Sequence, residues 1–278
     1  MQLVKNRYGK GRVRVMRVDR SGPQHVVREL NVKTIVEGDF ARAYTDKDNS
    51  TSLCTDTVKN LVNIVAYENI ALDTEKFCQT VAARFLKEYP QVESVSVHAD
   101  ETKWVRMTDA GAELPYGFMH DANGKPFADV VATRNGMTTK SGINGFTFLK
   151  TTESGWDNFY KDAYTTLAET RDRIAATAME ASWTWAQAPA DFATANALIL
   201  KTMLKVFATT YSESVQDSLF RMASAALEAV PEIADVSLAC PNKHYIPMNL
   251  SAFGIDNRLA VFLPTDEPHG QIECTVAR

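Results

Sequence analysis

The sequence predicts an α+β protein made of two tandem β-β-α-α-β-β units, each an antiparallel sheet with paired helices on one face. Three observations support this prediction. Apolar and polar residues alternate in several segments, two stretches with helical spacing end at a proline, and one motif occurs twice. We expect the units to comprise residues 1–136 and 137–278. Each half is long enough to bury a hydrophobic core.

Strand signals open the first unit. In residues 8–18 the pattern predicts three valines on one side of a strand and three arginines on the other: Val13, Val15 and Val18 against Arg12, Arg14 and Arg17. Residues 25–30 and 32–36 read as further strand, and residues 95–99 alternate in the same way. The dipeptides Asn123-Gly124 and Asn135-Gly136 indicate tight turns between strands.

Helical spacing appears twice in each unit. Thr55 suits the N-cap of a helix whose apolar residues are Val58, Leu61, Val62 and Val65. A second helix is expected from Thr74 to Pro90, with Phe77, Val81, Phe85 and Tyr89 on one face. The second unit then repeats this order: a strand over 143–149, a long insertion, a helix over 195–211, and a helix from Ser214 to Pro231.

The repeat is clearest after the two prolines. Residues 90–97 and 231–238 both fit the pattern P-x-[VI]-x-x-V-S-[VL], and they lie 141 residues apart in a chain of 278. The same offset carries the helix start at Thr74 onto Val215. Because four-stranded sheets have edges that must be paired or covered, we expect copies of the chain to close their sheets into a barrel.

Composition and charge exclude several classes of protein. Thirty Lys and Arg against 34 Asp and Glu give a net charge of −4, which argues against a protein that coats nucleic acid. No stretch approaches the ~18 apolar residues of a membrane helix, and the N-terminus lacks the apolar region of a signal peptide, so we expect a cytoplasmic protein. Four scattered cysteines predict reduced thiols, with one nucleophilic cysteine as the alternative: Cys54, Cys78, Cys240 and Cys274.

Motifs for nucleotide or metal binding are absent from the sequence. It contains no G-x-G-x-x-G, G-x-x-x-x-G-K-[ST], H-E-x-x-H or G-x-S-x-G, and its five histidines lie far apart. We therefore expect neither a metal nor an organic cofactor.

Polar clusters at the ends of predicted elements are functional candidates, each with a structural alternative. Asn242-Lys243-His244 follows directly on a strand and is either chemical or a polar strand exit. Tyr8-Gly9-Lys10 opens the first strand and is otherwise a charged strand end. Thr55-Asp56 starts a helix, where N–H groups bind an anion or are simply capped. Residues 214–217 fit a capping box.

Taken together, these segments resemble the urate oxidase (uricase) family. The matching segments run in family order along nearly the whole chain: Tyr8-Gly9-Lys10, Gly38-Asp39-Phe40, Asp48-Asn49-Ser50, residues 55–60, Gly145-Phe146, Leu149-Lys150, residues 164–167, Asp172-Arg173-Ile174, Ser214-Val215-Gln216, residues 241–244, Phe253-Gly254 and residues 272–276.

The resemblance implies a fold, an assembly and an activity. The fold is the tunnelling fold (T-fold), with two such domains per chain in a homotetramer whose active sites lie at subunit interfaces. The activity, part of purine degradation, is the oxidation of urate with O2 and water to 5-hydroxyisourate and hydrogen peroxide, without a cofactor. Two alternatives remain: another purine or pterin enzyme of this fold, which would need a zinc-binding cluster, and a non-catalytic purine-binding oligomer.

The resemblance also implies a role for individual residues. Lys10, Thr55 and His244 would relay protons. The substrate would lie between Thr55 and Asp56 of one chain and six residues of the other: Trp156, Arg173, Val215, Gln216, Asn242 and Ile272. The guanidinium and the glutamine amide suit adjacent oxygen and nitrogen atoms of a purine. Trp156 stands where the family usually has Phe, so it would enlarge the aromatic face beneath the ring.

Overall fold

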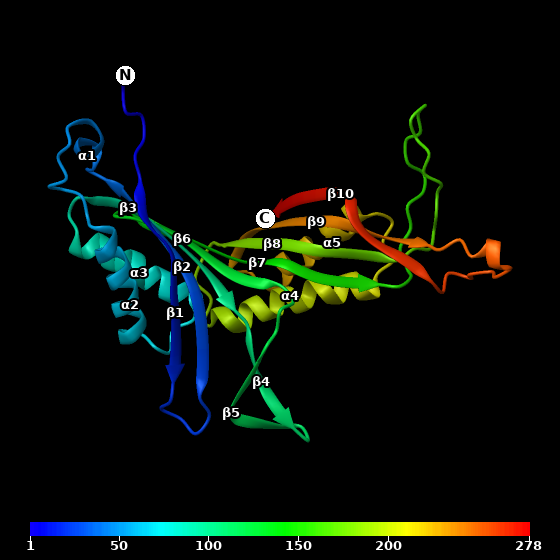
Figure 1. Cartoon of the computed structure of the whole chain (residues 1–278), viewed down its shortest axis with the longest axis horizontal. Coiled ribbons are helices and arrows are strands. Elements are labelled where there is room, and N and C mark those ends of the chain that lie inside the picture. Colours follow the sequence, from blue (N-terminus) through cyan, green and yellow to red (C-terminus); the bar gives the residue numbers. More distant parts are fainter. The chain divides into compact units, whose positions relative to one another are not determined.

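Antiparallel strands with helices on one face form each half of the chain, as Figure 1 shows for the computed structural model. The structure describes residues 1–278, and they divide into unit 1, Met1–Gly142, and unit 2, Ile143–Arg278. The predicted α+β class is confirmed in both units. The boundary expected after residue 136 falls at the start of one long strand, β7 (Gly136–Lys150), and the two units divide within that strand. None of the helices has both the length and the apolar character needed to cross a membrane.

Unit 1 contains the expected strands and helices together with two additions. In chain order its elements are β1 (Tyr8–Asp19), β2 (Val26–Gly38), α1 (Ala41–Thr45), α2 (Thr55–Glu68), α3 (Thr74–Glu88), β3 (Val92–Thr102), β4 (Trp104–Asp109), β5 (Ala112–His120) and β6 (Lys125–Thr133). The strand order is β1-β2-β3-β6, with antiparallel pairing throughout. The sequence reading did not anticipate the short helix α1 or the separate β4–β5 hairpin.

The core of unit 1 lies between helices α2 and α3 and the sheet face that they cover (Figure 1). Apolar side chains at alternate strand positions face the helices, because successive side chains in a strand point to opposite faces. Those from the sheet include Leu30, Val32, Val95 and Val97, and those from the helices include Val58, Phe77 and Phe85.

Arg17 was predicted on the side of β1 opposite Val13 and Val15, and this prediction is wrong. Alternation from Val13 and Val15 continues to Arg17, which is only 3% exposed, while Met16 points outward. The Arg17 Nη1 donates to the carbonyl oxygen of Asn69 at 2.9 Å, and the guanidinium lies 4.7 Å from the centre of the Phe77 ring. Burial lowers the pKa of Arg17 to about 10.

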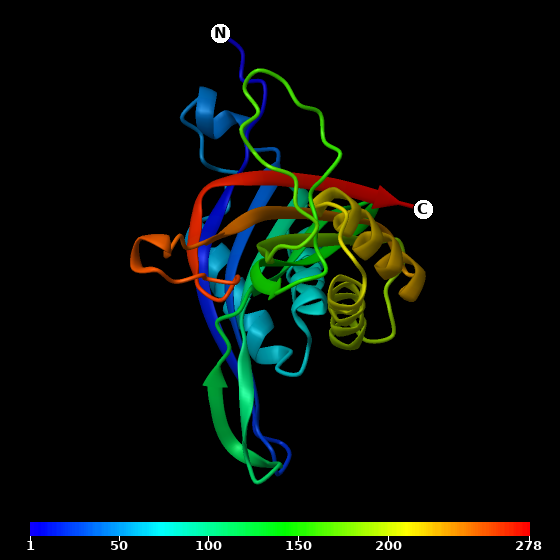
Figure 2. The same ribbon diagram turned by 90° about the vertical axis from the view of Figure 1, so that its right-hand side faces the viewer.

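Unit 2 has the same plan. Its elements are the rest of β7, then β8 (Ala175–Trp185), α4 (Phe192–Thr209), α5 (Val215–Ala229), β9 (Ile233–Pro247), the short helix η1 (Ser251–Phe253) and β10 (Phe262–Ala277). The strand order is β7-β8-β9-β10, and α4 and α5 lie side by side (Figure 2). Helix α4 begins three residues before the predicted start because Asp191 caps it, accepting from the backbone N–H of Thr194.

The internal repeat extends further than the motif that predicted it. Helices α3 and α5 both have 15 residues, and their starts, like those of β3 and β9, lie 141 residues apart. An arginine at the end of each repeat donates to carbonyl oxygens in the last turn of the second helix and in the residues that follow it. Arg134 contacts the oxygens of Leu86, Tyr89, Pro90 and Val92, and Arg278 contacts those of Leu227, Val230 and Ile233.

Candidate active site

The predicted site residues fall into two groups, one in each unit. In unit 1, Lys10 lies on β1, and Thr55 and Asp56 begin α2, the helix that packs on β1. Hydrogen bonding from Lys59, whose Nζ lies 2.5 Å from Oδ1 of Asp56, is the main cause that lowers the pKa of Asp56. The charge of Lys10 lowers the pKa of Asp56 further.

The start of α2 has no side-chain cap. Thr55 was expected at the N-cap, but Cys54 occupies that position and Thr55 is the first helical residue. The other three long helices are capped, by Asp73, Asp191 and Ser214. The N–H groups of the first turn of α2 therefore remain open at the positive end of the helix, an arrangement that binds anions and polar oxygens.

The backbone of β1 is irregular on both sides of Lys10, beginning with Gly9. A Cβ atom at Gly9 would lie 1.9 Å from the carbonyl oxygen of Thr34 on β2, so only glycine allows this close approach of the two strands. The pairing register then shifts between Lys10 and Val13, and Arg12 adopts a φ of 56°. Such a bulge redirects neighbouring side chains, and bulges are common beside functional sites.

In unit 2, the insertion between β7 and β8, residues 151–174, carries Trp156 and Arg173. The backbone of Trp156 bonds to that of Thr170 in both directions, at 2.7 and 3.0 Å, and the Arg173 N–H donates to the oxygen of Ser154 at 2.9 Å. The backbone of Ser154 also forms an isolated β-bridge with that of Ser212, which lies three residues before Val215. These backbone bonds bring Trp156 and Arg173 beside the chain that enters α5, where Val215 and the exposed Gln216 are the first two residues.

Asn242, His244 and Ile272 share one face of the β9–β10 pair. Leu238 and Cys240 point to the buried face of β9, and alternation carries that face on to Asn242 and His244, beyond the fully buried part of the strand. Ile272 pairs directly with Cys240, and directly opposed residues point to the same side of a sheet.

One pocket of unit 2 includes two of these residues. Val215 and Asn242 contribute to its wall together with Ser154 and Thr177, and its volume is about 30 Å³, which is room for one or two water-sized molecules. Five predicted residues do not line it: Trp156, Arg173, Gln216, His244 and Ile272. A flat ring would therefore have to lie outside this pocket.

Among the predicted site residues of unit 2, Arg173 has a buried hydrogen-bond donor without a partner. Its Nε is buried and has no hydrogen-bond partner. Burial lowers the pKa of Arg173, yet an arginine side chain stays charged at neutral pH. An unsatisfied buried donor on a charged group costs free energy, about 1–3 kcal/mol or more, and any water or ligand oxygen that accepts from it removes that cost.

Sequence reasoning missed two contacts of the insertion. Phe159 lies parallel to Trp156, with ring centres 5.5 Å apart and planes within 10°. The Tyr211 hydroxyl donates to the oxygen of Arg171 at 2.9 Å. The aromatic residue three positions after Trp156 was a signal for the first contact, but no local pattern indicated the second.

Two units of antiparallel strands in one chain, each with a pair of helices on one face, define a tandem T-fold protein. Comparison with known proteins identifies the family. A sequence model of the uricase family matches residues 6–131 and 139–273. The chain belongs to the uricase family.

Individual relatives agree with the family match over the full chain. A uricase of Dictyostelium discoideum is 35% identical over 280 residues, covering 99% of this chain and 97% of the relative. A uricase of Aspergillus flavus is 36% identical over 293 residues, covering 98% and 95%. The crystal structure of uricase from Arthrobacter globiformis superposes with a TM-score of 0.95 at 34% identity, covering 100% of this chain and 95% of that one.

Proposed function

We propose that this chain oxidises urate with O2 and water to 5-hydroxyisourate and hydrogen peroxide, in purine degradation and without a metal or organic cofactor. Urate gives two electrons to O2, and a water oxygen becomes the hydroxyl group of the product. O2 takes up two electrons and two protons and leaves as hydrogen peroxide. The protein therefore has to bind the anion, orient it and move protons.

The observation that carries this proposal is the unsatisfied Nε of Arg173 beside Trp156. A urate anion offers adjacent oxygen and nitrogen acceptors to the guanidinium, and the exposed Gln216 amide adds a donor and an acceptor. The indole of Trp156 stacks on the purine face, with Val215 and Ile272 as apolar walls. Asn242 contributes an amide for O2 or water opposite Thr55.

Proton transfer is assigned to Lys10, Thr55 and His244. Lys10 lies on β1 and Thr55 begins α2, and the packing of α2 on β1 supports a common location of the two residues. An ammonium beside a hydroxyl favours loss of the hydroxyl proton, and an imidazole passes a proton on near neutral pH. Thr55 and Asp56 also bind substrate through the open first turn of the helix.

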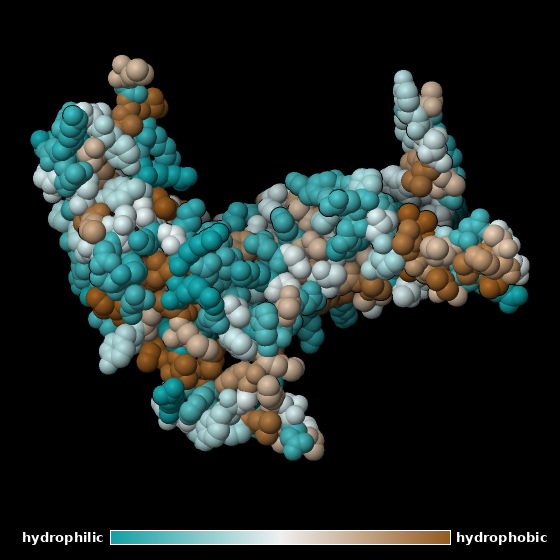
Figure 3. Space-filling view, viewed as in Figure 1, coloured by the Kyte–Doolittle hydropathy of each residue, from teal (hydrophilic) through white to brown (hydrophobic).

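The proposed assembly is a homotetramer with each site shared by two subunits. The division of the candidate residues between the two units supports it, because neither group alone surrounds a ring. The segment around η1 also exposes large apolar side chains, visible as brown atoms at the right of Figure 3: Ile246, Met248, Phe253, Ile255, Leu259, Val261 and Leu263. Such a patch is typical of a surface covered by a partner.

The four free thiols support a cytoplasmic location.

A zinc-dependent purine or pterin enzyme of the same fold is the second candidate. It would need at least three His, Cys, Asp or Glu side chains converging on one point, and the structure contains no such group. No observation favours this candidate over urate oxidation.

The test follows urate absorbance and peroxide with protein dialysed against EDTA. We expect turnover at full rate, whereas activity that is lost on dialysis and restored by a metal would contradict the cofactor-free reaction. Tight urate binding without oxygen uptake would instead identify a non-catalytic protein.

Variants test the proton relay. Lys10→Ala and His244→Ala should each lower kcat about 10²-fold or more while changing KM far less, because they remove proton transfer rather than binding. Lys201→Ala, an exposed lysine on α4, is the control and should leave both constants unchanged. A near-normal kcat in either relay variant at saturating urate would remove that residue from the mechanism.

A further inference from the structure

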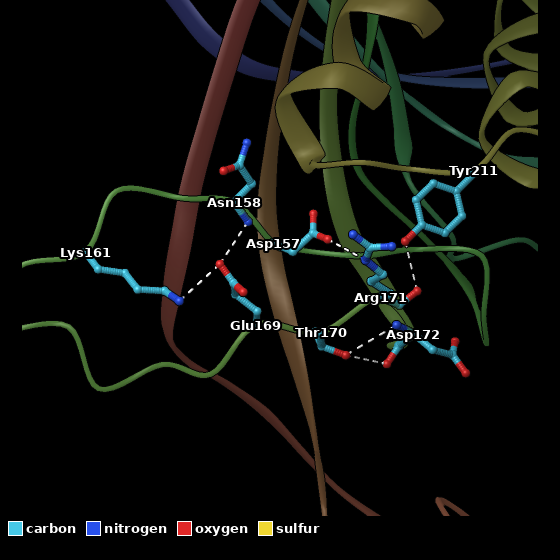
Figure 4. Close-up of polar contacts among 8 residues, drawn as sticks. All are labelled: Asp157, Asn158, Lys161, Glu169, Thr170, Arg171, Asp172 and Tyr211. Atoms are coloured by element: carbon cyan, nitrogen blue, oxygen red, sulfur yellow. Dashed lines mark hydrogen bonds and ion pairs between the residues drawn. The ribbon is translucent and has the colours of Figure 1, made fainter.

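The insertion at residues 151–174 has little regular structure of its own, yet it carries two of the proposed substrate residues. The chain runs outward in the first part of the insertion and returns in the second, and we call these two parts its strands. Figure 4 shows a set of polar contacts that joins the two strands to each other and to Tyr211. These contacts belong to none of the roles assigned above.

The Tyr211 side chain contacts both strands of the insertion, near Gly155 and near Arg171. Its hydroxyl donates to the backbone oxygen of Arg171 at 2.9 Å. The same hydroxyl covers Gly155, since a Cβ atom there would lie 2.3 Å from it and 3.2 Å from the Thr170 oxygen. Gly155 directly precedes Trp156, and Arg171 is two residues before Arg173, so this contact acts on the backbone of both substrate residues.

Asp157 and Arg171 form a second contact across the two strands. The Arg171 Nε donates to Oδ2 of Asp157 at 2.7 Å, and this hydrogen bond is the main cause that raises the pKa of Arg171. The Arg171 side chain is 86% exposed. An exposed ion pair adds little to global stability, so the effect of this pair is expected to be local.

A third group of contacts lies further along the insertion. Glu169 accepts from the backbone N–H of Asn158 at 3.0 Å and lies 3.1 Å from the Nζ of Lys161. The Lys161 ammonium lies 5.3 Å from the centre of the Phe159 ring, which in turn stacks on Trp156. The indole is thus supported on one face by a ring that is itself held in place.

We propose that Asp157, Arg171 and Tyr211 are positioning residues for the reaction assigned above, on which this inference rests. They hold the two strands of the insertion so that the Trp156 ring and the Arg173 guanidinium keep the geometry that a flat anion needs. The three residues act through the backbone of their neighbours. Holding the binding groups in place before the ligand arrives removes the ordering cost from binding.

A double-mutant cycle tests the ion pair. Asp157→Asn and Arg171→Gln should each raise KM for urate about threefold or more, and the double variant should be no worse than either single variant. Effects that add fully would show that the two side chains act independently and would overturn the inference.

Tyr211→Phe, which removes only the hydroxyl, should also raise KM about threefold or more, with kcat less affected. An unchanged KM in Tyr211→Phe would remove Tyr211 from the role.

Glu88→Gln is the matched control. It breaks an exposed ion pair, Arg84–Glu88, within α3 of unit 1 and should leave KM unchanged. An equal rise of KM in this variant would show that the loss of any exposed ion pair has the same effect, which would overturn the inference.

Trypsin cleavage after Lys161 gives a readout that does not depend on urate. Asp157→Asn and Tyr211→Phe keep every tryptic site of the insertion, and we expect cleavage about threefold faster or more in the native oligomer of each. Unchanged cleavage would mean that the contacts do not hold the insertion. Faster cleavage with an unchanged KM would overturn the positioning role. A wild-type protein that does not oxidise urate, with variants that are cleaved faster, would refute the proposed function but not the role of these contacts in holding the insertion.

Discussion

His98 on β3 illustrates how a single side chain makes the stability of unit 1 depend on pH. Its Nδ1 lies 2.8 Å from Oδ1 of Asp129 on β6, and its Nε2 lies 3.3 Å from Oδ1 of Asp100. Lys33 pairs with it on β2, and the Phe127 ring stacks 5.7 Å away. The hydrogen bond with Asp129 is the main cause that raises the pKa of His98 above its ordinary 6.5.

The sign of the pH dependence follows from this shift. Because the folded-state pKa is raised, the protonated histidine stabilises the fold fully below pH 6.5, and that contribution is lost as pH rises through the raised pKa. We expect the Tm of the wild type to fall relative to that of His98→Gln as pH rises from 6 to about 8.5. Parallel Tm curves for the two proteins over this range would contradict the prediction.

At the scale of elements, the arginine that closes each repeat is the main feature that only the structure shows. Arg134 donates to the carbonyl oxygen of Leu86 and Arg278 to that of Leu227, and each of these oxygens belongs to the last turn of a helix, where it has no partner within the helix. Their cationic groups also lie at the negative end of the helix dipole. The equivalent contacts in the two units indicate one solution to the same problem, the connection from the second helix to the following strand.

Loss of either arginine should destabilise its unit. We expect Arg134→Gln and Arg278→Gln each to lower the free energy of unfolding by about 1 kcal/mol, and lysine replacements to recover only part of it, since lysine lacks the fork of donors. Denaturant midpoints measure the effect, with Arg42→Gln as a control at an exposed pair with Asp48. Midpoints equal to that of the control would show that these contacts contribute nothing.

At the scale of the whole molecule, the proposed site has one half in unit 1 and the other in unit 2 of a second chain. Activity should then be recovered between two inactive variants, Lys10→Ala and Arg173→Ala, when they are co-expressed with different tags. Random co-assembly leaves about a quarter of the sites with both halves intact. The purified mixed oligomer should show about that fraction of wild-type activity, whereas activity no higher than that of the separate variants would place each site within one chain.

Much of the fold and of the candidate site was predictable because the signals are local. Alternating apolar residues, helical stripes and the two prolines act over a few neighbouring positions, and they yielded the order of the main strands and helices. The family resemblance supplied the candidate residues, whose roles stay predictions. The short helix α1 and the β4–β5 hairpin were missed because five helical residues, or two short exposed strands, leave little apolar periodicity.

By itself, the sequence determined the class of fold, its twofold repeat and the membership of a family, since each is written in patterns along the chain. Only the tertiary structure decided that Arg17 faces the core, that Cys54 rather than Thr55 precedes the helix, and that the Arg173 Nε has no partner. It also decided that Tyr211 fastens an insertion 40 residues away in sequence. These features depend on which distant segments meet, and packing, not local preference, determines that.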